Sequence, residues 1–237
     1  MKVLQGSAFE VLKTLPEESV DVVYTAPSPF AYYKDQPEKI GGKPRPVDYI
    51  NDLVNLCKEC YSVLKPSGSL FIQLGDQFTK HGDLMGIPCN FENWMITSHF
   101  DDSVYWKLND RLIWHRKENL SFKYKERGFL KNYEFIFHFV KDLDKFYFNT
   151  NSKYIRSSVH SYAIEDSYFT NEFDSGLPEQ LTQIIIDTSC PPKGTILDPL
   201  AGTGKVGVVA KKMNRDAILI DIDFETCERI KTRLGLQ

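Results

Sequence analysis

The spacing of apolar positions along the chain switches repeatedly between the two-residue period of strands and the 3.6-residue period of helices. Apolar runs bounded by turn residues predict strands at 2–4, 20–25, 105–115, 133–140, 195–197 and 217–220, and in the segment before Gly75. Helical spacing predicts helices at 7–15, 46–64, 83–98, 177–188, 206–213 and 224–234. Ser7 and Glu10 have the spacing of a capping box at the first helix. The alternation of the two element types predicts an α/β domain.

The most informative stretch is 194–223, in which a strand, a glycine-rich turn, a helix and a second strand follow one another. Gly202 and Gly204 permit backbone angles that side chains disfavour, and they let a ligand approach main-chain N–H groups closely. The second strand delivers Asp221 to the carboxyl edge of the sheet, where a carboxylate commonly binds ribose hydroxyls. This pattern predicts a nucleoside site, and its plain alternative is a tight turn without a ligand.

Individual residues exclude two other nucleotide-binding motifs. A phosphate-binding P-loop has a glycine at the place of Pro199 and a serine or threonine at the place of Val206, so Lys205 is not a phosphate-binding lysine. A dinucleotide-binding fingerprint needs three spaced glycines, and the residues from Pro199 to Ala201 do not supply them.

A second candidate site is the loop Ala26-Pro27-Ser28-Pro29-Phe30, which follows the predicted strand 20–25. Two prolines stiffen the backbone, remove N–H donors and leave carbonyl oxygens as acceptors. Such acceptors can bind the exocyclic amine of an extruded base, and the ring of Phe30 can stack on that base. The alternative is a stiff proline-rich turn with a core phenylalanine. The polar segment 31–46 is typical of a mobile loop over such a site.

Composition locates the basic charge in one part of the chain. The net charge is −3, yet residues 104–160 carry twelve lysines and arginines against six aspartates and glutamates. Lys123, Lys125, Arg127 and Lys131 alternate with aromatic residues, which is typical of a DNA-facing surface and also of a solvated sheet edge. A specific DNA-reading enzyme often combines a basic face with an acidic remainder.

Cysteine usage and hydropathy bear on metal binding and on membrane location. The five cysteines include a C-x-x-C pair at Cys57 and Cys60, but no second pair stands at ligand spacing, so we expect half-buried thiols and no metal site. No apolar run approaches the roughly 20 residues that span a bilayer, and the first residues lack the apolar core of a signal peptide. We therefore expect a cytoplasmic protein without a membrane segment.

Several blocks together resemble one enzyme family. The run from Asp198 to Gly204 resembles the D-P-F-x-G-S/T-G motif of S-adenosylmethionine-dependent DNA amino-methyltransferases, and loop 26–30 resembles their S-P-P-Y/F motif. Loop 26–30 departs from that motif, because it is one residue longer and its first polar residue is replaced by Ala26 or displaced to Ser28. Segments ending in Gly75-Asp76, in I-W-H-R at 113–116 and in the strand 133–140 also match family blocks. The order of catalytic loop, recognition insert and cofactor loop is that of the β class.

The resemblance implies a doubly wound, mostly parallel, seven-stranded sheet in a single domain, 1–237, with a target-recognition insert at 142–174. It implies base flipping and a direct in-line attack by the amine on the methyl group, with catalytic residues at Ala26, Pro27, Ser28, Pro29 and Phe30. S-adenosyl-L-methionine is the implied cofactor, bound by Asp76, Ser175, Leu177, Pro178, Asp198, Pro199, Ala201, Gly202, Thr203, Gly204, Asp221 and Ile222. The implied DNA contacts are Arg116, Lys117, Lys123, Lys125, Arg127, Lys131, Lys153 and Arg156.

The implied activity is methylation of cytosine N4 in double-stranded DNA, because the catalytic loop lacks the leading aspartate of adenine enzymes. Adenine N6 is the alternative target. A catalytically inactive DNA-binding subunit with the same fold is a hypothesis of another class, favoured by the irregular loop 26–30, and an RNA methyltransferase is a third. A cognate restriction endonuclease and a second copy of the chain are the further partners considered.

Overall fold

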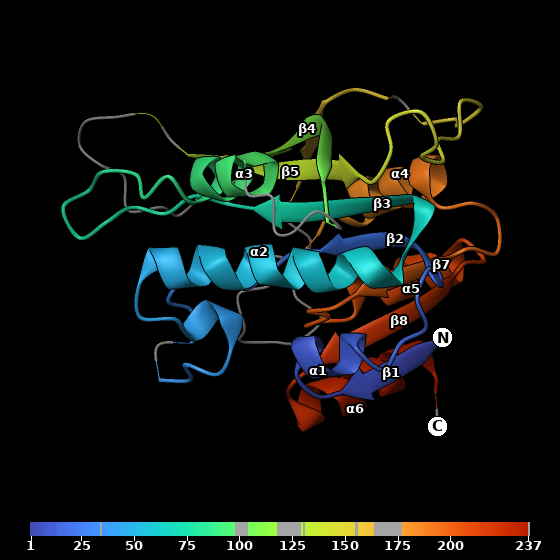
Figure 1. The fold of residues 1–237 in the computed structure, drawn as a ribbon, viewed down its shortest axis with the longest axis horizontal. Helices are drawn as coiled ribbons and strands as arrows, with labels where there is room; N and C mark the ends of the chain where they lie inside the picture. The colour runs from blue at the N-terminus through green and yellow to red at the C-terminus, as the bar shows by residue number, and fades with distance from the viewer. Residues whose placement is uncertain are drawn as a thin grey trace.

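The computed structural model describes residues 1–33, 35–97, 104–117, 129, 131–154, 156–163 and 177–236. In these residues eight strands form one sheet, in the order β1-β8-β7-β2-β3-β5-β4-β6 (Figure 1). They are β1 (Lys2–Gln5), β2 (Val20–Thr25), β3 (Leu64–Leu74), β4 (Lys107–Arg116), β5 (Tyr133–Val140), β6 (Val159–Tyr162), β7 (Thr195–Asp198) and β8 (Asp216–Asp221). The predicted α/β class is confirmed, and the expected number of seven strands is corrected to eight in the described part.

Most neighbours in the sheet are parallel. β1, β8, β7, β2 and β3 all run in one direction, β5 runs against β3 and β4, and β6 is parallel to β4. The added strand is β6, which lies in the segment expected to be an irregular insert. It is only four residues long, and its pairing with β4, not a strong apolar pattern of its own, makes it a strand.

The helices form two layers, one on each face of the sheet. Along β3 successive side chains alternate, so that Leu70 and Ile72 pack with residues of α1 (Ala8–Leu12), α2 (Pro46–Val63) and α3 (Ile87–Thr97). Phe71 faces the other way, into a cluster with residues of α4 (Glu179–Ser189), α5 (Lys205–Lys212) and α6 (Phe224–Leu234). This is the doubly wound arrangement that the family resemblance implies.

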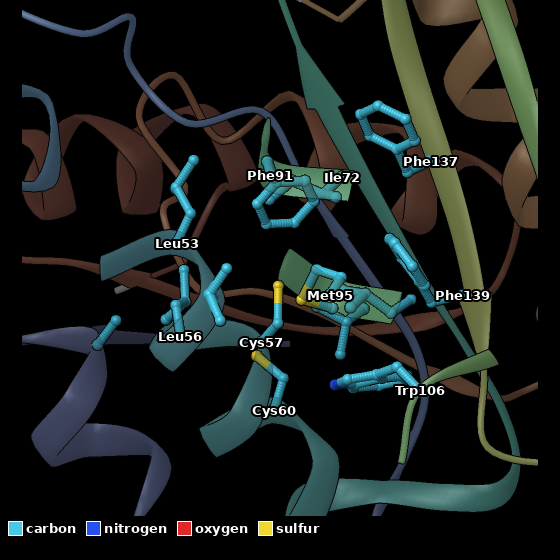
Figure 2. Packing of buried hydrophobic residues seen from close by; sticks show 14 of the residues in the cluster. Leu53, Leu56, Cys57, Cys60, Ile72, Phe91, Met95, Trp106, Phe137 and Phe139 are labelled. Carbon is cyan, nitrogen blue, oxygen red and sulfur yellow. The ribbon is translucent and has the colours of Figure 1, made fainter. Parts of the chain in front are cut away.

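The first of these layers contains a densely aromatic core. Figure 2 shows Cys57 of α2 beside Met95 of α3, with the rings of Phe91, Phe137 and Phe139 closing the space toward β5. The rings of Phe91 and Phe137 have centroids 5.9 Å apart. Both thiols of the C-x-x-C pair are buried here as free cysteines, and burial raises the pKa of each thiol. A high thiol pKa disfavours the thiolate that metal binding or redox chemistry needs.

The element boundaries differ from the predictions at a few ends. α1 ends at Leu12, and the side chain of its N-cap residue Ser7 makes no capping hydrogen bond, so the predicted capping box is wrong. α3 begins at Ile87, four residues later than expected, because the preceding residues form a hairpin. In the described part of the chain, none of the helices combines the length and the apolar content needed to cross a bilayer.

Strand register brings the informative segments to one edge of the sheet. Thr25 pairs with Ile72, and Val23 pairs with Leu197, so β2, β3 and β7 end together. Asp198 in turn pairs with Leu219 of β8. Loop 26–30, residues 75–76, the glycine turn and Asp221 therefore all emerge at the carboxyl edge.

Candidate cofactor and catalytic site

The glycine turn has the backbone that its sequence predicts. Gly202 and Gly204 both adopt positive φ, 48° and 70°, and Gly204 is the N-cap of α5. A Cβ on Gly204 would lie 2.8 Å from Cγ2 of Ile230, so this glycine allows close helix packing. A Cβ on Gly202 would meet no atom within 4 Å, so the backbone there borders open space. Gly202 therefore has the accessible position that a ligand-binding turn requires.

Asp221 is tied directly to this turn. Its carboxylate accepts hydrogen bonds from Gly202 N at 2.9 Å and from Asp223 N at 2.9 Å. Burial raises the pKa of Asp221 above its usual value. These two hydrogen bonds and the charge of Lys39 offset only part of that rise. Lys39 belongs to the 31–46 segment, so at this residue the segment lies near enough to Asp221 for its charge to act on the carboxylate. Ile222 lies beside Asp221, and its carbonyl accepts from Gln5 Nε2 at 3.1 Å.

Asp198 is the buried acid of the turn. It is 3% exposed, and burial raises the pKa of Asp198 to about 7, an effect that the Thr25 hydroxyl and the Leu200 N–H partly offset. The turn that starts at Pro199 is held by a hydrogen bond from Ala201 N to the Ile220 carbonyl, at 2.8 Å. A second brace comes from α6, where the Arg233 guanidinium donates to the carbonyl of Thr203 at 2.7 Å.

Loop 26–30 is held rigidly by its neighbours. The hydroxyl of Tyr49 in α2 donates to the Ser28 carbonyl at 3.0 Å, and the Tyr32 N–H donates to the Pro29 carbonyl at 3.1 Å. A Cβ on Gly41 would lie 3.0 Å from the Pro29 oxygen, so a larger residue there would crowd the loop backbone. Among the described residues, hydrogen bonds to the carbonyls of Ala26 and Pro27 are absent. These two oxygens are the acceptors that the loop has to offer.

Phe30 has less freedom than a purely exposed stacking residue would have. Its ring lies 6.0 Å from that of Tyr49, and it packs at the margin of the core. It also lines a pocket of about 360 Å³, together with residues of the 31–46 segment, which are Ala31, Asp35, Pro37, Gly42, Lys43 and Pro44. The Phe30 ring therefore packs against Tyr49 of α2 on one side and lines the pocket on another.

Asp76 is placed at the same edge, but its carboxylate is engaged by nearby backbone. One oxygen accepts from Gln77 N at 2.9 Å and from Ile87 N at 3.1 Å, and the other accepts from Gly86 N at 3.1 Å. These bonds close the base of the hairpin before α3, and contact with a cofactor remains a prediction. Leu177 and Pro178 are both buried ahead of α4, whereas Ser175 lies outside the described residues.

Some of the predicted DNA contacts lie at the carboxyl edge, and others lie outside the described residues. Arg116 at the end of β4 pairs with Glu134 at 3.3 Å, and Lys131 lies with its Nζ 5.8 Å from the centre of the Phe78 ring, both at the carboxyl edge. Lys117 directly follows Arg116, and its N–H donates to the Tyr162 carbonyl. Three further predicted contacts lie outside the described residues, namely Lys123, Lys125 and Arg127.

The first part of the expected recognition insert runs along the opposite edge. Tyr147 N donates to the Ser67 carbonyl near the start of β3, and Asn149 N donates to the Thr188 carbonyl at the end of α4. Arg156 lies over the Phe148 ring at 5.7 Å, and Lys153 lies over the Tyr154 ring at 5.3 Å. The chain returns toward the carboxyl edge only along β6.

Sequence reasoning missed three contributors to the site. Tyr49 stands at an apolar position of the predicted helix 46–64, which favours a place in the core, and no sequence pattern indicates that its hydroxyl reaches Ser28. Lys39 lies in an aperiodic segment, so nothing in the sequence indicates that its charge acts on Asp221. Arg233 is 30 positions from Thr203, and only the packing of α6 against the turn brings the two together.

A doubly wound sheet with a glycine turn and an acidic strand end at its carboxyl edge defines a Rossmann-like α/β fold. Residues 20–232 match the family of N6/N4 methyltransferases, which are DNA methylases. The chain belongs to this amino-methyltransferase family, as the motif order predicted.

Curated relatives are methyltransferases, and solved structures share the fold of this chain. The chain is 28% identical to type II methyltransferase M.MwoI of Methanothermobacter wolfeii over 99% of its own length, but it spans only 34% of that protein. It is 24% identical to M.SmaI of Serratia marcescens, covering 98% of this chain and 90% of the relative. The fold matches the cytosine-N4-specific PvuII DNA methyltransferase with a TM-score of 0.81 at 21% identity, covering 98% of this chain and 85% of that one. It matches the M1.HpyAVI–SAM complex with a TM-score of 0.71 at 20% identity, covering 99% of both chains.

Proposed function

We propose that this chain methylates the exocyclic N4 of cytosine in double-stranded DNA, using S-adenosyl-L-methionine as the methyl donor. The observation that carries the proposal is the register of β2 and β7, in which Val23 pairs with Leu197. It makes the proline loop and the glycine turn neighbours at one edge. A methyl donor held by the glycine turn and a target amine held by the proline loop would then meet without a large rearrangement.

The residues of the chain fit both ligands. The open backbone at Gly202 and the carboxylate of Asp221 would hold the nucleoside part of the donor. When bound, the donor supplies an electrophilic methyl group. The carbonyl oxygens of Ala26 and Pro27 would accept the amine protons of a flipped base and orient its nitrogen, and Phe30 would contact the base face. Binding energy spent on this orientation lowers the barrier to transfer.

The choice of cytosine rests on two supports. The PvuII enzyme that shares this fold is cytosine-N4-specific by its title. The second support is the residue that follows Thr25, which is Ala26 and not the aspartate of adenine enzymes. Adenine N6 remains the competing target because the family includes both kinds of enzyme.

The test is product identity. Purified protein is incubated with tritium-labelled donor and a duplex of mixed sequence, and the DNA is digested to nucleosides for mass spectrometry. We expect labelled N4-methylcytosine. N6-methyladenine would replace the cytosine proposal, and label in RNA alone would replace the DNA proposal. Duplex binding without any labelled nucleoside would favour the inactive-subunit hypothesis.

A matched pair of variants assigns the reaction to the proposed site. Asp221→Asn keeps the shape of the side chain but removes the charge next to Gly202, and we expect at least a tenfold weaker donor affinity. Asp216→Asn is the control, because Asp216 lies at the other end of the same strand and is exposed. Equal donor affinity in the two variants would contradict the assignment of Asp221.

The target-reading surface follows from the path of the insert. Because residues 142–152 lie along the amino edge, we propose that target reading depends on the residues from β6 onward and on Arg116 and Lys131. The type II relatives also support a cognate restriction endonuclease as a companion of this chain. Protection of cellular DNA against a co-expressed type II endonuclease would test that companion role.

A further inference from the structure

The hairpin at 76–86 is a well-formed element, and beyond Asp76 at its base none of its residues is assigned to either proposed ligand site. Phe78 and Leu84 form an antiparallel bridge, and Thr79 N donates to the Asp83 carbonyl at 2.8 Å. The Thr79 hydroxyl donates to the Asp83 carboxylate at 2.8 Å, which closes the tip. The three bonds to Asp76 fix its base. The hairpin is thus an internally bonded ribbon.

Its position is next to the proposed catalytic loop. It begins two residues after Leu74, the last residue of β3, and β3 is paired with β2 as far as Thr25. Loop 26–30 and the base of the hairpin therefore leave adjacent strands at the same edge. Figure 1 shows the segment after β3 projecting well beyond that edge.

The side chains that the ribbon presents are of two kinds. Phe78 is 44% exposed and Leu84 is 51% exposed, and as a directly opposed pair they lie on the same face of the ribbon. Exposed Lys80 and His81 stand at the tip, and the Lys131 ammonium lies over the Phe78 ring. The Asp83 charge beside them is partly engaged by Thr79. Exposed apolar side chains next to lysines favour a ligand that is a polyanion and also presents apolar groups.

We propose that hairpin 76–86 binds duplex DNA beside the extruded base, with Phe78 and Leu84 against a groove and Lys80 on a phosphate. A two-stranded ribbon fits the width of the major groove, where apolar side chains contact thymine methyl groups. Phosphate contacts by lysine provide affinity without reading sequence. The inference rests on the proposed DNA substrate and adds a binding element that the family motifs do not include.

The experiment compares binding of a fluorescein-labelled 40-base-pair duplex of mixed sequence by fluorescence anisotropy. The double variant Phe78→Ala with Leu84→Ala should bind roughly tenfold more weakly, since each lost contact weakens binding several-fold. Leu143→Ala is the matched control, because Leu143 is 48% exposed and follows β5 at the opposite edge. We expect that control to bind within about twofold of the wild type.

Lys80→Ala gives an independent readout. Removing one phosphate contact should make the fall of log affinity with log salt less steep, by about 0.9 in slope. It should also weaken binding of all sequences alike. Donor affinity measured by calorimetry should stay unchanged in all these variants, which shows that the cofactor side remains folded.

Several results would overturn the inference. Duplex binding by the double variant at wild-type strength is one, and an unchanged salt slope for Lys80→Ala is another. A third is a wild-type dimer in sedimentation that the double variant loses, since the apolar pair would then serve a second copy of this chain. If the wild type binds the duplex but transfers no methyl group, the proposed reaction fails while the anisotropy comparison still decides the role of the hairpin.

Discussion

Gly202 and Gly204 are separated by one residue, yet they lie in different surroundings. Both have positive φ, but only Gly204 is packed against a helix, while Gly202 borders open space. The sequence predicts the need for glycine at both positions. The sequence does not predict which glycine is packed and which is open, because Ile230 is 26 positions away from Gly204 and is brought close only by the fold.

We expect Gly204→Ala and Gly202→Ala to affect different properties. Gly204→Ala adds a Cβ 2.8 Å from Ile230, and it should lower the free energy of unfolding by about 2–3 kcal/mol. Gly202→Ala carries mainly the strain of positive φ, about 1 kcal/mol, and should weaken donor binding strongly. Urea unfolding and calorimetry on the two variants measure these effects. A larger stability loss for Gly202→Ala would contradict this division.

Asp198 makes stability depend on pH. Its pKa rises from 3.8 to about 7 on folding because burial disfavours the carboxylate. The folded state therefore holds the proton more tightly, so this contribution to stability is complete below pH 4 and is lost as the pH rises to about 7. Asp198→Asn removes it. Between pH 4 and 7, the unfolding free energy of the variant should rise relative to that of the wild type, by up to about 1.4 kcal/mol per pH unit. A constant difference in urea unfolding across that range would contradict the assignment.

At the scale of elements, the proline loop depends on α2 for its position. The Tyr49 hydroxyl holds the Ser28 carbonyl, and Gly41 packs on the carbonyl that follows. The loop is thus clamped from two sides, which leaves the oxygens of Ala26 and Pro27 as its acceptors. The sequence predicted a rigid loop from its prolines, but the clamp depends on contacts between residues 21 positions apart.

Tyr49→Phe tests the clamp. It deletes one hydroxyl from a buried ring, so the core packing is kept while the Ser28 carbonyl loses its donor. We expect kcat to fall roughly five- to twentyfold because the loop becomes less well placed, with donor affinity unchanged. Tyr61→Phe is a matched control on the same helix, since Tyr61 packs with Trp106 away from the loop. Equal kcat for Tyr49→Phe and the wild type would show that the clamp is dispensable.

Elements were predictable where their pattern was local. β2, β5 and α6 have the predicted ends, because each is a continuous apolar or amphipathic run between strong boundary residues. β6 was missed because four residues carry too little periodicity, and it exists only by pairing with β4. The helix predicted at 83–98 starts four residues too early, in the second arm of the hairpin, because Asp76, which fixes the hairpin base, acts across ten positions of sequence.

At the scale of the whole molecule, the fold unites motifs from opposite ends of the chain. The first strands supply the proline loop and the last strands supply the glycine turn, and parallel register brings both to one edge. The order of motifs was enough to predict the family and the fold class. The order of motifs does not predict the contacts of Tyr49 and Arg233 with the two loops, or the effect of the Lys39 charge on Asp221, because these depend on packing alone.

The most direct test of this account is a single-turnover measurement of methyl transfer from labelled donor to saturating duplex DNA. Pro27→Ala loosens the acceptor loop without touching the glycine turn, so donor affinity should match the wild type. The transfer rate should fall by about 100-fold, or about 2.7 kcal/mol of barrier. Wild-type transfer by the Pro27→Ala protein with normal donor affinity would show that the two loops do not form one reaction centre.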